Sequence, residues 1–141
     1  MNVVTREFAF DMGHMLPDHE GACYRPHGHR YRGELSICGP LQEEGSERGM
    51  VADFAALRDV FDQCVMTIYD HRFAVCVDDP RAGGMRALFE PGDLIPVALP
   101  PTVENLAMWI GRSCASRLEG VSEMVSVRLW ETPNCSALWT P

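Results

Sequence analysis

Three histidines and one cysteine near the start of the chain have the spacing of a metal-dependent catalytic site. His27 and His29 are two residues apart, so on an extended strand both side chains point to the same face, about 6.6 Å apart along the strand. His14 lies thirteen residues before His27 and could come from the preceding strand. Three imidazoles with an open fourth position are the ligand set of catalytic rather than structural zinc. Cys23, four residues before His27, lies where a nucleophile or base could face that open position.

The apolar pattern around these histidines favours their convergence. In 8–14 and 27–37, the residues that share a face with a histidine are mostly apolar, so all three imidazoles point to the apolar side of a two-stranded unit. An imidazole there needs a partner, because an unpaired buried polar group costs about 1–3 kcal/mol. A fourth histidine, His19, lies between two acidic residues and is interpreted as part of a loop. The two faces comprise Phe8, Phe10, Met12 and His14, and His27, His29, Tyr31, Gly33, Leu35 and Ile37.

An acid–histidine pair, Asp70-His71, follows the first helical segment. A histidine at this place can act as a cation near the negative end of the helix dipole, which is a structural role. It can also be a proton shuttle oriented by the neighbouring carboxylate. Adjacency in the sequence does not decide between these roles, because neighbouring residues on a strand point to opposite faces.

Glu131 ends a segment in which Val125, Val127 and Leu129 share its face. A carboxylate on an apolar face requires hydrogen-bond donors. It could accept two parallel hydrogen bonds from a planar N–H fork, such as an arginine or an amino-substituted heterocycle presents. A ligand-binding role and an internal salt bridge are the two alternatives for this residue.

The composition is that of one ordinary domain spanning 1–141. With 141 residues, the chain is long enough to bury its own core, so zinc would not be needed to hold the fold. The formal net charge of −8 argues against a nucleic-acid partner, which would favour a basic surface. All 12 basic residues are arginines, so phosphates or other anionic groups of a ligand would be met by guanidinium groups.

The cysteine pattern and the apolar runs favour a reducing cytoplasm. The 6 cysteines form no CxxC pair, and the first residues lack the apolar run of a signal peptide. No stretch approaches about eighteen consecutive apolar residues, so we expect no membrane-spanning helix and no membrane partner. Most cysteines are then small core residues, a role that fits Cys64 and Cys114 within helical patterns.

The elements that would position these residues follow in the order ββααββ. Asp53 and Thr102 are plausible N-caps of two helices. Residues 76–101 hold five prolines and three glycines, and we expect an extended loop with a short strand near 94–99. The four main strands are expected at about 3–14, 28–38, 123–131 and 135–140. The apolar helix positions are Phe54, Leu57, Phe61, Val65 and Ile68, then Leu106, Trp109, Ile110, Ser113 and Leu118, with Gly120 as the end of the second helix.

This order predicts an α+β fold, an antiparallel four-stranded sheet with both helices on one face. Such a sheet leaves two exposed edges, which favour aggregation unless they are paired. Association into a ring or barrel would pair them, so we expect a homo-oligomer whose active site is built across subunits.

Several motifs stand in the order seen in the family of 6-pyruvoyl-tetrahydropterin and 6-carboxytetrahydropterin synthases, which the chain resembles along almost its whole length. The motifs are Phe8-Ala9-Phe10-Asp11-Met12-Gly13-His14, Cys23 with His27-Gly28-His29, Gly49-Met50-Val51-Ala52-Asp53-Phe54, Asp70-His71, Pro101-Thr102-Val103-Glu104-Asn105 and Glu131-Thr132. The connection through residue 101 is longer than in compact bacterial members.

The resemblance implies a tunnelling fold (T-fold), in which ββααββ subunits assemble into a barrel, commonly a homohexamer made of two trimers. It also implies roles for individual residues. By these roles, His14, His27 and His29 bind Zn²⁺, Cys23 is the general base, Asp70 and His71 work with it, and Glu131 anchors the pterin, with Thr102 and Glu104 as further substrate-binding residues.

The implied activity is that of a zinc-dependent carbon–carbon lyase. A cysteine followed by three residues and then His-Gly-His is the spacing of the bacterial 6-carboxytetrahydropterin synthases, which convert 7,8-dihydroneopterin triphosphate to 6-carboxy-5,6,7,8-tetrahydropterin, acetaldehyde and triphosphate on the route to queuosine and other 7-deazaguanines. Arginines such as Arg25 or Arg30 would meet the phosphates. Thr-Val-Glu-Asn at 102–105 is also similar to pyruvoyl-type members, so triphosphate elimination to the pyruvoyl product is the first alternative. The second is a non-catalytic structural zinc module with Cys23 and the three histidines as ligands.

Overall fold

A computed structural model describes the backbone of residues 1–141 and every side chain except that of Met124. The strands are β1 (Asn2–His14), β2 (His27–Gly39), β3 (Arg72–Cys76), β4 (Leu94–Val97), β5 (Met124–Thr132) and β6 (Cys135–Trp139). The helices are α1 (Phe54–Phe61), α2 (Thr67–Tyr69), α3 (Ala82–Arg86) and α4 (Val103–Arg117), with a 3-10 turn at Ala22–Tyr24 and a π-helical segment at Asp62–Met66. Among the described residues, no helix is long and apolar enough to cross a membrane.

The four expected antiparallel strands are present, but the sheet has six strands in the order β4-β3-β1-β2-β5-β6. β1 pairs with β2 over its whole length, and β2–β5 and β5–β6 are also antiparallel. β3 runs parallel to both β1 and β4, so the expectation of a four-stranded, wholly antiparallel sheet was wrong. β3 is short and four of its five residues are buried, the continuous apolar run typical of a parallel strand rather than an alternating one.

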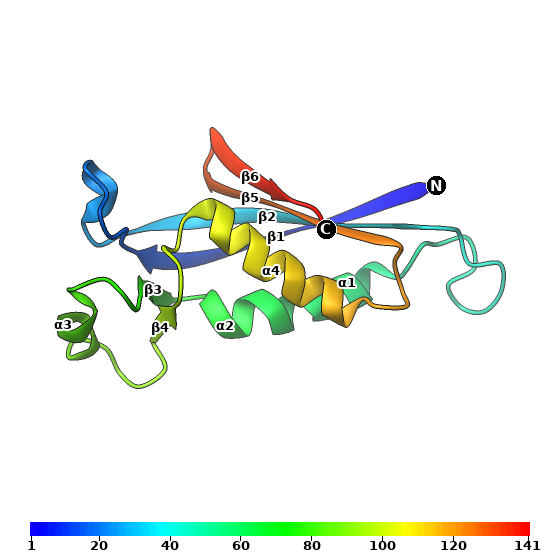
Figure 1. The fold of residues 1–141 in the computed structure, drawn as a ribbon. Coiled ribbons are helices and arrows are strands. Elements are labelled where there is room, and N and C mark those ends of the chain that lie inside the picture. Colours follow the sequence, from blue (N-terminus) through cyan, green and yellow to red (C-terminus); the bar gives the residue numbers. More distant parts are fainter.

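The long helices lie on one face of the sheet, as expected (Figure 1). Asp53 caps α1 by accepting a hydrogen bond from the Ala55 N–H at 2.8 Å, and Thr102 caps α4. Between helices and sheet lies one main core, which includes Phe10, Tyr31, Leu57 and Ile110. In α4, Trp109 and Ser113 are only half-buried; the buried positions are Val103, Leu106, Ala107, Ile110, Gly111 and Cys114, followed by Leu118.

The first helix differs from the expected continuous α-helix. The π-helical segment at Asp62–Met66 inserts one extra residue into the turn, so the inward position moves from Ile68 to Tyr69. Tyr69 is accordingly buried, whereas Ile68 is 36% exposed and Phe54 49% exposed. The expected apolar positions were therefore wrong at both ends of the helix and correct in its middle.

The connection 76–101 is more ordered than the extended loop that its prolines and glycines indicated. It contains α3 and then β4, which adds an edge strand beside β3. A second, smaller core forms here from Met15, Phe73, Val75 and Ala82, so the end of β1 packs against α3. All six cysteines are free; Cys38, Cys64, Cys76 and Cys114 are buried, and Cys135 is exposed.

Candidate active site

The structure brings the three histidines together where the β1–β2 pair ends. His14 and His27 are directly opposite each other in the register, and His29 follows on the same face. The Nε2 atoms of His14 and His27 are 3.0 Å apart, and one ring nitrogen from each of the three imidazoles lies within 4.8 Å of the others. This is the convergence that the parity of the two segments predicts.

Backbone carbonyls fix two of the rings with their Nε2 atoms toward the centre of the cluster. His14 Nδ1 donates to the Pro101 carbonyl at 2.7 Å, and His27 Nδ1 donates to the Arg25 carbonyl at 2.7 Å. A carbonyl can only accept, so both protons lie on Nδ1 and both Nε2 lone pairs point inward. Metal-binding histidines are commonly oriented in this way.

The chemistry of the cluster fits a divalent cation such as zinc. His29 Nε2 is buried and has no hydrogen-bond partner among the described residues. Burial lowers the pKa of His14 to about 4, and burial likewise lowers the pKa of His29. Neutral imidazoles are the form that binds metal. Two inward lone pairs 3.0 Å apart repel each other unless a cation lies between them, and the three histidines could supply three ligands to it.

Glu131 lies beside the histidine cluster, at the end of β5. Its Oε1 is 3.5 Å from His14 Nε2 and 3.6 Å from His29 Nε2, and its side chain is 21% exposed. Val125, Val127 and Leu129 are buried on the same face, as the alternation predicts. The carboxylate also lines an open pocket of about 720 Å³, where a ligand could reach it from solvent.

Cys23 lies in the 3-10 turn between β1 and β2 and is half-buried. Its carbonyl accepts a hydrogen bond from the Leu16 N–H at 3.0 Å. Burial raises the pKa of the Tyr31 hydroxyl, and its proximity to Glu131 and Cys23 raises it further, so Cys23 lies near the histidine side of the sheet. Cys23 belongs to neither of the two groups of converging ligand atoms among the described residues, which are the three histidines and Asp11 with Asp70 and His71.

Asp70 and His71 are held against Asp11 at the turn that leads into β3. The Asp70 carboxylate accepts from the Asp11 N–H at 2.9 Å and from His71 Nδ1 at 2.8 Å. These interactions, with the Asp11 N–H first, lower the pKa of Asp70. His71 adopts a left-handed φ of 57°, and its N–H donates to the Asp11 carbonyl at 2.7 Å. Asp70 thus orients an imidazole that is 77% exposed.

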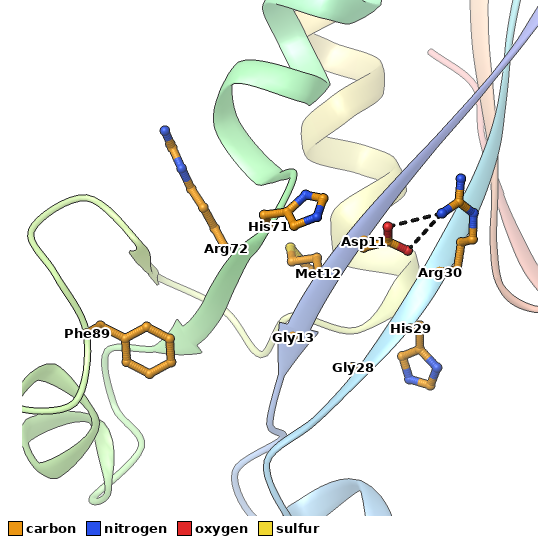
Figure 2. A pocket seen from close by; sticks show the side chains of 9 residues that line it. All are labelled: Asp11, Met12, Gly13, Gly28, His29, Arg30, His71, Arg72 and Phe89. Carbon is orange, nitrogen blue, oxygen red and sulfur yellow. Dashed lines mark hydrogen bonds and ion pairs between the residues drawn. The ribbon is translucent and has the colours of Figure 1, made fainter.

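One alternative for His71 was a structural role as a cation near the negative end of the helix dipole. Arg72, not His71, places a cation there. Arg72 donates to the Ile68 carbonyl at 3.1 Å, close to the end of α2. The His71 ring instead lies beside Asp11, which forms an ion pair with Arg30 at 3.1 Å (Figure 2). Arg30, one of the two arginines expected to meet phosphates, is therefore already paired with a carboxylate.

The two halves of the expected catalytic machinery lie on opposite faces of β1, although His29 and His71 both line an open pocket of about 440 Å³. Asp11 alternates with the inward-facing Phe10 and Met12, so its side chain is on the opposite face of β1 from His14. Figure 2 shows the His29 ring pointing away from the Asp11–Arg30 pair. No hydrogen bond or ion pair among the described side chains joins Asp70 or His71 to Cys23 or to the histidine cluster.

Thr102 and Glu104 are at the start of α4, beside the histidine cluster. The Thr102 hydroxyl accepts from the Asn105 N–H at 3.4 Å, and Glu104 is exposed in the first turn. The adjacent Pro101 carbonyl is the acceptor that orients His14. Of the motif Pro101–Asn105, it is therefore the backbone oxygen of Pro101 that contacts a histidine of the cluster.

The 6-pyruvoyl tetrahydropterin synthase family model matches residues 3–141. The chain belongs to this family. It is 31% identical over 134 residues to a 6-carboxy-5,6,7,8-tetrahydropterin synthase of Haemophilus influenzae, with 92% of each chain covered. It is 34% identical over 140 residues to a protein of the same name from Synechocystis, covering 97% of this chain and 92% of the relative.

Two solved structures show the same fold. An uncharacterized protein from Wolinella succinogenes matches with a TM-score of 0.80 at 24% identity, covering 99% of this chain and 97% of the other. The 6-pyruvoyl tetrahydropterin synthase of Plasmodium vivax matches with a TM-score of 0.75 at 16% identity, covering 100% and 99%. The expected tunnelling fold is confirmed.

Two groups that hold the site were not singled out by sequence reasoning. Asp11 binds Asp70 and His71 through its backbone, and the Tyr31 hydroxyl is 3.4 Å from His14 Nδ1. Tyr31 was placed on the correct face but read only as a core residue. Asp11 holds Asp70 and His71 through main-chain atoms that every residue has, so the residue type gives no signal for these two contacts.

Proposed function

We propose that this chain is a 6-carboxy-5,6,7,8-tetrahydropterin synthase, converting 7,8-dihydroneopterin triphosphate to 6-carboxy-5,6,7,8-tetrahydropterin, acetaldehyde and triphosphate on the route to queuosine and other 7-deazaguanines. The observation that carries the proposal is the cluster of three imidazoles, two of them oriented by backbone carbonyls, with Cys23 outside the ligand group. The relatives named 6-carboxy-5,6,7,8-tetrahydropterin synthase, at 31% and 34% identity over nearly the whole chain, support this choice of product.

We propose that His14, His27 and His29 hold one zinc ion per chain. The buried Nε2 of His29, which has no hydrogen-bond partner among the described residues, and the inward Nε2 atoms of the other two support this. When bound, zinc with an open position supplies Lewis-acid stabilisation to oxygens of the substrate side chain. A structural module with Cys23 as fourth ligand is disfavoured, because Cys23 is absent from the convergent group.

The remaining residues would handle the substrate and its protons. Cys23 would remove a proton from the substrate side chain, and His71, held by the anionic Asp70, would relay protons. Glu131 would accept the N–H fork of the pterin, which its partial exposure and the adjoining pocket allow. Thr102 and Glu104 would contact the substrate from the start of α4.

We propose that the active site is completed by a second copy of the single domain 1–141, within a homohexamer of two trimers. The exposed imidazole of His71 and its position on the other face from His14 support this, since no hydrogen bond or ion pair among the described side chains joins the two halves. The edge strands β4 and β6 each have a free side for pairing. Six unpaired cysteines support a reducing cytoplasm as the location.

Product identification tests the proposal. The purified, zinc-loaded protein is incubated with 7,8-dihydroneopterin triphosphate, and the products are identified by mass spectrometry together with an assay for acetaldehyde. We expect the carboxy product and acetaldehyde in equal amounts. The pyruvoyl compound without acetaldehyde would establish the pyruvoyl-type activity, which the Thr-Val-Glu-Asn motif also fits. An unchanged substrate would contradict both activities.

A further inference from the structure

A buried ion pair in the long connection between β3 and α4 has no role in the function described above. Asp79 is 3% exposed, and its carboxylate binds Arg81 through two contacts, 2.9 Å from Nε and 2.6 Å from Nη2. Asp79 also accepts from the Arg81 N–H at 2.9 Å. These hydrogen bonds lower the pKa of Asp79, so the carboxylate is anionic and fixes the plane of the guanidinium.

The rest of the Arg81 guanidinium points at the loop that carries Cys23. Nη1 donates to the Tyr24 carbonyl, and Nη2 lies 3.5 Å from the Leu16 carbonyl. The guanidinium also stacks over the Tyr24 ring at 3.7 Å from its centroid. The Arg81 side chain thus contacts both ends of the loop, at Leu16 and Tyr24. These residues precede Arg81 in the chain by 65 and 57 positions.

Cys23 lies between these contacts. Its own carbonyl accepts from Leu16 N–H at 3.0 Å, while the next residue, Tyr24, is bound by Arg81. Beneath the loop, Met15 is fully buried in the small core that contains Ala82, the residue after Arg81. The 3-10 turn itself has no buried residue and no side-chain cap, and the contacts of His19 with Gly21 N–H and of His27 with the Arg25 carbonyl come from residues only two positions away.

We infer that Arg81, fixed by Asp79, is a positioning residue that holds the Cys23 loop in place for catalysis. The catalytic consequence rests on the proposed function, whereas the effect on the Cys23 thiol does not. The connection 76–101 then serves as a support for the cysteine, in addition to leading the chain to α4. Arginine is required, because a planar fork can bind a carboxylate and two carbonyls at once, and a lysine ammonium cannot reproduce that geometry.

The experiment compares Arg81→Lys and Arg81→Ala with the control Arg86→Ala. Arg86 is an exposed arginine at the end of α3, with no hydrogen bond or ion pair among the described residues, so its loss changes the net charge equally. Arg81→Lys keeps a cation beside Asp79, which guards against unfolding from an unpaired buried carboxylate. Each zinc-loaded protein is measured for kcat, KM, zinc content and the rate at which iodoacetamide alkylates Cys23, followed by peptide mass spectrometry in a Cys135→Ser background.

We expect Arg81→Lys to lower kcat by about 10- to 100-fold, with KM within about threefold of the wild type, because a misplaced catalytic group slows the chemistry more than it weakens binding. Its Cys23 alkylation rate should differ several-fold from that of the wild type and of Arg86→Ala, at unchanged zinc content. A lower melting temperature with wild-type kcat and alkylation rate would overturn the inference and leave Arg81 a purely structural residue. If the wild type converts no pterin, the alkylation rate still decides the inference, while the proposed function fails separately.

Discussion

The histidine cluster and the Asp70–His71 pair are built in contrasting ways. His14 is fully buried, and backbone carbonyls orient both it and His27. His71 is 77% exposed, and one carboxylate on the neighbouring residue orients its ring. The first arrangement has fixed, buried groups that could hold a cation. The second offers an imidazole to something outside the chain.

In the proposed homohexamer, the difference between the two regions would divide metal binding from proton transfer. A metal site needs several ligands within a few tenths of an ångström of fixed positions, which buried strand ends supply. A proton relay needs one oriented imidazole that a partner can approach. Each chain would therefore carry a complete metal site and one half of an acid–base site, which makes the two regions separable by mutation.

Removal of a metal ligand should have the largest effect. We expect His14→Ala to reduce bound zinc from about one per chain to below a tenth and to abolish turnover, since two remaining imidazoles are too few for a catalytic zinc site. Zinc is measured by inductively coupled plasma mass spectrometry. His19→Ala is the control, because His19 is an exposed loop histidine that accepts a hydrogen bond from Gly21 N–H. A wild-type zinc content in His14→Ala would show that the ion lies elsewhere.

Changes in the acid–base half should abolish most activity without loss of zinc. We expect Cys23→Ala and His71→Ala each to lower kcat by about 10²- to 10⁴-fold with zinc retained. When the two variants are dissociated, mixed and reassembled, part of the activity should return, because some sites combine an intact Cys23 from one chain with an intact His71 from another.

The matched control for this mixture is each variant dissociated and reassembled alone, which should recover nothing. Native mass spectrometry shows whether mixed oligomers have formed. Mixed oligomers that stay inactive would place the whole site within one chain and remove the contrast between the two regions.

Glu131→Gln should weaken binding of the pterin substrate and leave the zinc content unchanged. We expect KM to rise by about 10- to 100-fold, because the amide replaces one acceptor by a donor that opposes the N–H fork, and a hydrogen bond to a charged group contributes about 1.5–3 kcal/mol. Glu123→Gln removes the same charge at an exposed position and should leave KM unchanged. A loss of stability at unchanged KM would instead identify Glu131 as an internal salt-bridge partner of the histidines.

The smallest effect concerns the pH dependence of stability without metal. The pKa of His14 is about 4 in the folded chain against 6.5 for an ordinary histidine, so between these values the unfolded state binds more protons. The contribution of the neutral, buried His14 to the free energy of unfolding is therefore fully present above pH 6.5, and it is lost as the pH falls toward 4. We expect the free energy of unfolding to drop by on the order of 2 kcal/mol between pH 7 and 5 from this group.

Urea denaturation of the metal-free protein at the two pH values measures this change. His14→Asn keeps a donor near the Pro101 carbonyl but does not titrate, so its stability should depend less on pH in this range. Equal pH dependence in the two proteins would show that the buried imidazole is not the group responsible.

The sequence predicted the histidine site well because its signal is local. Alternation placed His14, His27 and His29 on the apolar face, and a long antiparallel pair converts that parity directly into convergence. The same alternation placed Glu131 correctly beside Val125, Val127 and Leu129. The four long strands and both helix caps were correct for the same reason: each has a pattern within a few residues.

The parts that were missed depend on contacts between distant segments. β3 has only five residues without alternation, and its partners β1 and β4 are parallel and therefore not joined to it by a tight turn. The Pro101 and Arg25 carbonyls that orient two histidines leave no mark in the side-chain sequence. The shift from Ile68 to Tyr69 required knowledge of the π-helical segment, which no residue type specifies.

The hydrogen bond from His14 to the Pro101 carbonyl joins residues that are 87 positions apart and ties the end of β1 to the start of α4. Any ligand that holds the His14 ring in place therefore also favours the docking of that helix. By thermodynamic linkage, the reverse is equally true: a well-docked α4 raises the affinity of the histidines for their ion. Zinc held by the three histidines, as proposed, should accordingly slow the amide hydrogen exchange of residues 102–106, because metal binding and the docking of α4 are coupled.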